Sequence, residues 1–145
     1  MADDLRDEFY SPIYSGLSDQ DNLAVSVGKG SQLVVIRVEH GAKPPLFHFK
    51  KVRGDFPSEY SYYEISIHNL NTLVEGREVV AIPGARAHTW ILEYQSRQHE
   101  FVILQHLFWP SSLWNVNANK TISIGLWEEA PYPKRQLFRI PLLQG

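Results

Sequence analysis

Short apolar segments alternate with turn-forming residues along the whole chain. The segments are rich in β-branched and aromatic residues, and none keeps the period of an amphipathic helix. This pattern predicts twelve strands, at residues 9–14, 23–27, 33–38, 46–52, 62–67, 72–75, 79–82, 89–94, 100–107, 113–116, 121–127 and 136–143. Antiparallel barrels and sandwiches have strands at about this spacing, so we expect an all-β fold.

An aromatic residue followed two positions later by another apolar residue recurs three times. The copies are Phe47 with Phe49, Trp90 with Leu92, and Phe138 with Ile140, and they lie about 45 residues apart. Because side chains alternate between the two faces of a strand, these six residues should face the interior. The residues between them, His48, Ile91 and Arg139, should point outward.

The period of about 45 residues, with four strands in each unit, predicts a β-trefoil. Six of its strands would close a barrel, and the other six would form three hairpins that cap one end. We therefore expect an all-β, twelve-stranded β-trefoil in three pseudo-threefold repeats, at about residues 9–52, 60–95 and 99–143. This single domain would cover residues 9–145, after an acidic N-terminal tail at residues 1–8.

The composition narrows the range of functions. The 145 residues include no Cys, which excludes disulfides, thiolate catalysis and cysteine-ligated metals. The formal net charge is -2, from 14 Lys and Arg against 16 Asp and Glu, so no nucleic-acid partner is expected. The N-terminus is acidic, and no apolar run approaches the ~20 residues that span a bilayer. We therefore expect no membrane partner and a cytoplasmic location.

The sequence contains none of the common signatures of catalysis. Its six histidines have no metal-ligand spacing, and it has no nucleophile elbow, dinucleotide fingerprint or phosphate loop followed by a helix. We expect a protein that is not an enzyme and that holds no metal or cofactor. Its binding residues should lie on loops that a rigid scaffold presents.

Two loops with basic side chains stand out. Residues 128–136 contain Pro131, Tyr132 and Pro133, then Lys134 and Arg135, and the prolines should make this loop stiff and protruding. A stiff loop that offers Lys or Arg suits a trypsin-like protease, because the basic side chain enters a pocket with a carboxylate at its base. Lys29, at the tip of a glycine-flanked turn, is the second candidate. The alternative for both loops is an ordinary solvated, charged surface.

An aromatic and amide-rich hairpin is a third candidate site. It contains Trp109, Trp114, Asn115, Asn117 and Asn119. Aromatic rings pack on the C–H faces of sugars while amides pair with hydroxyls, so this hairpin indicates a carbohydrate site. In the alternative interpretation, the tryptophans close the hairpin cap of the core.

The chain resembles the small cytosolic β-trefoils of mushrooms, and within that group it is similar to the fungal serine protease inhibitors of the mycospin type. The residues that carry the resemblance lie at 89–92, 101–103, 122–124 and 137–142, whereas the first repeat has Phe47 in place of Trp. The resemblance implies that inhibition resides in one exposed loop, at Lys134 or Arg135, or else at Lys29.

A competing resemblance is to ricin-type trefoil lectins, whose repeats carry a Q-x-W motif. Gln136 and Phe138 match it in part, with Phe in place of Trp. Cytokine-like trefoils are a third resemblance, and their growth-factor group fits poorly with the acidic net charge. Our hypothesis is a reversible inhibitor whose partner is a trypsin-like serine protease, with a glycan-binding lectin as the alternative. The sequence predicts no oligomeric state.

Overall fold

The computed structural model describes residues 8–52, 61–105, 111–126 and 131–141. The strands are β1 (Glu8–Ser11), β2 (Tyr14–Ser15), β3 (Leu23–Val27), β4 (Leu33–Arg37), β5 (Phe47–Lys51), β6 (Ser61–Ile67), β7 (Leu70–Glu75), β8 (Glu78–Ile82), β9 (Thr89–Gln95), β10 (Glu100–Leu104), β11 (Ser112–Val116), β12 (Ile122–Leu126) and β13 (Phe138–Arg139). Two 3-10 turns accompany them, η2 (Lys29–Ser31) and η3 (Lys134–Gln136). The prediction of an all-β fold is confirmed, and within these ranges no helix has the length and hydropathy to cross a membrane.

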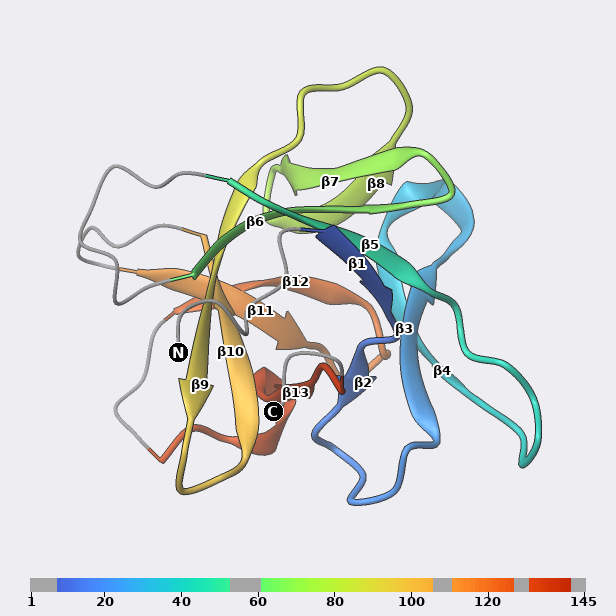
Figure 1. The fold of residues 1–145 in the computed structure, drawn as a ribbon, viewed down its shortest axis with the longest axis vertical. Helices are drawn as coiled ribbons and strands as arrows, with labels where there is room; N and C mark the ends of the chain where they lie inside the picture. Colours follow the sequence, from blue (N-terminus) through green and yellow to red (C-terminus); the bar gives the residue numbers. More distant parts are fainter. Residues whose placement is uncertain (1–7, 53–60, 106–110, 127–130, 142–145) are drawn as a thin grey trace.

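Seven strands pair side by side in a closed ring (Figure 1). The antiparallel pairings run from β1 to β5, β6, β9, β10, β13 and β2. Because β2 follows β1 directly in the chain, these two short strands act as one interrupted strand that closes the ring. The ring therefore has the six strand positions that the sequence pattern predicts for a barrel.

The interruption between β1 and β2 corrects the predicted strand at residues 9–14. Pro12 has no backbone N–H and cannot continue the ladder, and Ser11 turns its hydroxyl to the Pro12 carbonyl at 3.0 Å. The next carbonyl, that of Ile13, accepts a hydrogen bond from the Val25 N–H at 2.8 Å. The chain thereby leaves β5, with which β1 pairs, and joins β3, with which β2 pairs. As a result, the described ranges hold thirteen strands in place of the twelve predicted.

Three hairpins, β3–β4, β7–β8 and β11–β12, stand beside the ring and contact one another. Each contact joins a different pair of hairpins: Ser123 lies opposite Glu78, Gln32 opposite Val80, and Val34 opposite Thr121. The three hairpins therefore form one connected layer. The loops at their ends and between the ring strands are the segments that the scaffold leaves for binding.

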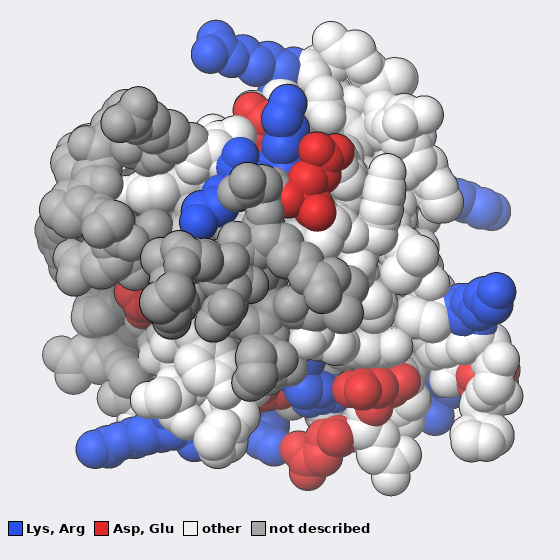
Figure 2. Space-filling model, in the orientation of Figure 1, with Lys and Arg blue, Asp and Glu red and all other residues white. Residues whose placement is uncertain are grey.

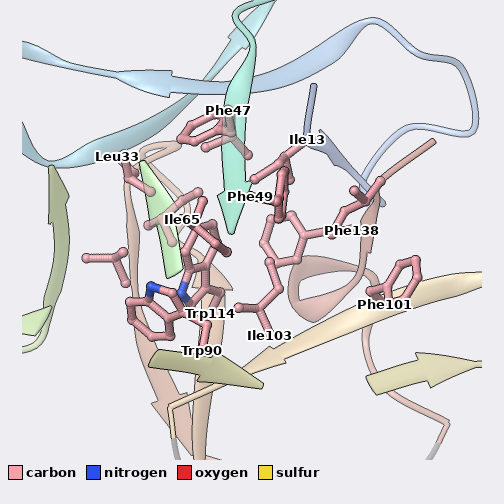
Figure 3. Close-up of a cluster of buried hydrophobic side chains, with 14 of the residues drawn as sticks. Ile13, Leu33, Phe47, Phe49, Ile65, Trp90, Phe101, Ile103, Trp114 and Phe138 are labelled. Carbon is pink, nitrogen blue, oxygen red and sulfur yellow. The ribbon is translucent and has the colours of Figure 1, made fainter. Parts of the chain in front are cut away.

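An aromatic core fills the ring (Figure 3). Trp90, Trp114 and Phe138 are fully buried and pack edge to face, with ring centroids 5.3 Å and 5.9 Å apart. The six residues predicted to face inward all belong to this cluster, which confirms that expectation.

The prediction that Ile91 points outward, away from the core, needs a correction. Ile91 lies outside the main core, as its place between Trp90 and Leu92 requires, but its exposed fraction is only 4%. A second apolar cluster, which includes Tyr132 and Leu137, covers it. The outer face of β9 is therefore covered at Ile91 by the segment that precedes β13.

Truncation of the central aromatic stack should destabilise the whole domain. We expect Trp114→Ala to lower the free energy of unfolding by about 3–5 kcal/mol, because the surrounding core cannot collapse into the space left. Urea denaturation followed by circular dichroism measures this loss. Leu126→Ala is the control, since Leu126 is 63% exposed on the neighbouring strand and should change stability by less than ~0.5 kcal/mol. A loss below ~1 kcal/mol for Trp114→Ala would show that the stack is not the centre of the core.

Candidate functional site

Residues 131–136 are fastened to the barrel at Tyr132. The Tyr132 side chain is 6% exposed and belongs to the second apolar cluster with Ile91. Its backbone is held by the Gln98 amide: Gln98 Nε2 donates to the Tyr132 carbonyl at 3.0 Å, and the Tyr132 N–H donates to Gln98 Oε1 at 3.1 Å. The base of this loop is therefore rigidly attached to the β9–β10 connection.

Only part of the 131–136 segment protrudes. Pro131, Lys134 and Arg135 are exposed, whereas Tyr132 and Gln136 are buried. Pro133 is extended, with φ −65° and ψ 150°, but the chain then enters the η3 turn, in which the Gln136 N–H donates to the Pro133 carbonyl at 2.9 Å. The two basic residues therefore lie on a tight turn, because burial of Gln136 pulls the chain back toward the barrel.

Both basic residues of η3 have partners. Lys134 Nζ lies 3.1 Å from Asp19 Oδ1, but the two side chains are 61% and 89% exposed, so this ion pair contributes little stability. Arg135 Nε donates to Asn115 Oδ1 at 3.1 Å. Two carboxylates earlier in the same loop, Glu128 and Glu129, lie outside the described residues.

Lys29 lies at the tip of the β3–β4 hairpin, as predicted. The turn is closed by a 2.8 Å hydrogen bond from the Gly28 N–H to the Gln32 carbonyl. Gly30 and Ser31 both have positive φ, 78° and 76°, so the chain reverses immediately after Lys29. Within the described ranges, no hydrogen bond or ion pair involves the Lys29 side chain, which is exposed.

The prediction that Trp114 belongs to a carbohydrate site needs a correction. This residue is fully buried between Trp90 and Phe138, so its ring cannot serve as an open platform for a sugar. The alternative interpretation, in which it belongs to the core, is confirmed. Trp109 lies outside the described residues.

The asparagines of this hairpin bind other groups of the protein. Asn115 Oδ1 accepts hydrogen bonds from Arg135 and Gln136. Asn117 and Asn119 hold the β11–β12 turn through Thr121: Asn117 Nδ2 donates to its Oγ1 at 3.0 Å, and Asn119 Oδ1 accepts from the same hydroxyl at 2.6 Å. These amides therefore stabilise the hairpin and the base of η3.

A half-buried ionic cluster ties β13 to its neighbouring strand β10 and to the loop between β2 and β3. Arg139 Nη1 lies 2.7 Å from Glu100 Oε2, and Arg139 Nε lies 3.0 Å from Asp21 Oδ1. The Arg139 and Glu100 side chains are only 16% and 12% exposed, so solvent screens their attraction weakly. Beside this cluster, burial and the Asp21 carboxylate raise the pKa of Tyr14, while Arg139 acts in the opposite direction.

The raised pKa of Tyr14 predicts a loss of stability in alkali. The unfolded chain releases this phenol proton near pH 10, before the folded chain does, so the stabilising contribution is complete below pH 10 and falls as the pH rises. Urea denaturation of wild type and Tyr14→Phe between pH 8 and 11 measures the effect. The wild type should lose stability more steeply above pH 10, whereas parallel curves would refute the assignment.

An exposed arginine that the sequence patterns did not single out lies in the β8–β9 connection. Residues 83–88 leave β8 through Pro83 and Gly84, and Arg86 is exposed beyond them. Asn71 and His88 fasten this loop on its two sides. In the sequence, this arginine is marked only by its place between two alanines after a proline–glycine turn. That pattern matches no established binding motif.

Comparisons with known proteins agree with this architecture. No protein-family model matches the chain, and no curated protein matches it. Among solved structures, the chain is similar to a proteinase inhibitor from Coprinopsis cinerea, with a TM-score of 0.67. The match covers 94% of this chain and 98% of that protein, at 13% sequence identity. At that identity the likeness shows a shared all-β fold.

Proposed function

We propose that the protein is a β-trefoil inhibitor of trypsin-like serine proteases and that it binds its target reversibly through one exposed loop. The observation that carries the proposal is the likeness to a fungal proteinase inhibitor over nearly the full length of both chains. The closed ring of strands and the layer of three mutually contacting hairpins support the trefoil assignment.

The distribution of charge supports a loop as the binding element. On the face shown in Figure 2, Lys and Arg side chains project from several edges and do not gather into one basic patch. A trypsin-like protease needs only one such side chain, because the carboxylate at the base of its specificity pocket binds a single Lys or Arg. The expected interface is of ordinary size, about 800 Å² on each partner.

Rigid attachment of the loops supports reversible inhibition by a protein without disulfides. A loop already held in its bound shape loses little conformational entropy when the protease binds it. In this chain the fastening comes from buried side chains and amide hydrogen bonds, of which Tyr132 and Gln98 are one example. Lys29, Lys134 and Arg135 remain the candidates that the sequence predicts for the basic side chain.

We expect the protein to inhibit trypsin and to leave chymotrypsin and elastase active. The reason is that neither of those enzymes has a carboxylate at the base of its specificity pocket. Residual hydrolysis of a chromogenic peptide by each enzyme, titrated with the inhibitor, measures this selectivity. No inhibition of trypsin at micromolar protein would refute the proposed function.

Release of the loop base should weaken inhibition if residues 131–136 make the contact. Gln98→Ala removes both hydrogen bonds to the Tyr132 backbone and should lower stability by about 1 kcal/mol. The trypsin inhibition constant of this variant is compared with those of Lys134→Ala and Arg135→Ala. Unchanged inhibition by all three variants excludes this loop as the contact, and Lys29→Ala then tests the β3–β4 turn in the same assay.

A further inference from the structure

The geometry points to the β8–β9 connection, residues 83–88, as the loop that enters the protease, with Arg86 in its specificity pocket. This inference rests on the proposed function and assigns the contact to a loop that the sequence patterns did not single out. Figure 1 shows the connection projecting from the top of the view, beyond β7 and β8.

Asn71 holds the first part of the loop, where the chain leaves β8. Asn71 lies on β7, directly opposite Ile82, the last residue of β8. Its Nδ2 donates a hydrogen bond of 2.6 Å to the carbonyl of Ala85, the residue before Arg86. A side-chain amide therefore holds the backbone immediately before the basic residue.

His88 supports the loop on the side that enters β9. Its backbone N–H donates to the Thr72 carbonyl at 3.1 Å, and its Nε2 lies 2.8 Å from the Gln105 carbonyl. The imidazole also packs edge to face on Trp90, with ring centroids 4.5 Å apart. Trp90 is fully buried, so this end of the loop is anchored to the aromatic core.

Residues 85–87 suit entry into a protease cleft. Arg86 is exposed and lies between Ala85 and Ala87, whose methyl groups offer little steric hindrance. Residues 86–88 belong to no turn or helix, and no residue from 85 to 88 has a positive φ. Within the described ranges, no hydrogen bond or ion pair holds the Arg86 guanidinium, so the side chain is available to a carboxylate.

The other basic candidates lack this backbone geometry. A substrate-like segment binds in an extended form, pairing with the enzyme as an added strand. The chain reverses at Gly30 directly after Lys29, and Lys134 begins the η3 turn. Among these candidates, Arg86 is therefore the one followed by residues that form no turn. It is also preceded by a backbone carbonyl that a hydrogen bond holds in place.

Trypsin inhibition constants of matched variants test the assignment. Arg86→Ala should raise the inhibition constant at least ~30-fold, the effect of losing a central buried side chain from an interface. Arg86→Lys should stay within ~10-fold, because lysine carries the same charge. Arg77→Ala is the control, since it removes an equal charge from an exposed arginine of the adjacent β7–β8 hairpin and should change inhibition less than ~2-fold.

Asn71 is tested as a positioning residue. Asn71→Asp keeps the size of the side chain but cannot donate to the Ala85 carbonyl. We expect faster dissociation from trypsin and faster hydrolysis of the Arg86–Ala87 peptide bond, in which water adds to the bond and releases a new carboxylate and a new amine. Mass spectrometry of the products measures this cleavage, and thermal unfolding of each variant reports any loss of folded protein.

The outcomes separate this inference from the proposed function. If the wild type inhibits trypsin and folded Arg86→Ala inhibits equally well, the assignment to Arg86 is overturned and the inhibitor function stands. Cleavage in the wild type at Lys29 or Lys134 in place of Arg86 also overturns it. If the wild type does not inhibit trypsin, the proposed function fails first.

Discussion

The edge-to-face stack of Trp90, Trp114 and Phe138 is the interaction on which the rest of the structure depends. These rings come from β9, β11 and β13, so a single cluster joins two strands of the closed ring to one of the three hairpins. A chain without cysteine has no disulfide with which to fix its loops. The aromatic core supplies the fixed frame, and each candidate loop is only as rigid as its attachment to that core.

Attachment to the frame takes a different form at each loop. Residues 131–136 are held by a buried tyrosine and by the amide of Gln98, and residues 83–88 are held by Asn71 and by a histidine packed on Trp90. The Lys29 turn is held by its own backbone hydrogen bonds and by Gln32, whose Nε2 donates to the Ile122 carbonyl at 3.1 Å. Of these three loops, the β8–β9 loop alone joins fastened ends to an exposed base outside a tight turn, and for this reason we assign the protease contact to it.

Much of the frame could be predicted from sequence, because alternation along a strand is a local property. The aromatic motif identified the inward positions of three ring strands, and each predicted strand has a counterpart in the structure. The break at Pro12 could also have been inferred, since proline cannot donate to a ladder. The burial of Ile91 could not, because it depends on a segment from the other end of the chain that folds over β9.

The candidate site was harder to predict for the same reason. The sequence around Trp114, with its neighbouring asparagines, is typical of a carbohydrate-binding surface. Only the tertiary packing shows that the Trp114 ring lies in the core. The Asn71 bond to Ala85 joins two strands through a side chain that no sequence motif marks. The most direct test is a crystal structure of the complex with trypsin, for which we predict the Arg86 guanidinium in the specificity pocket and a barrel that moves by less than about 1 Å. A complex with Lys29 or Lys134 in that pocket, or with residues 83–88 away from the enzyme, would contradict the account.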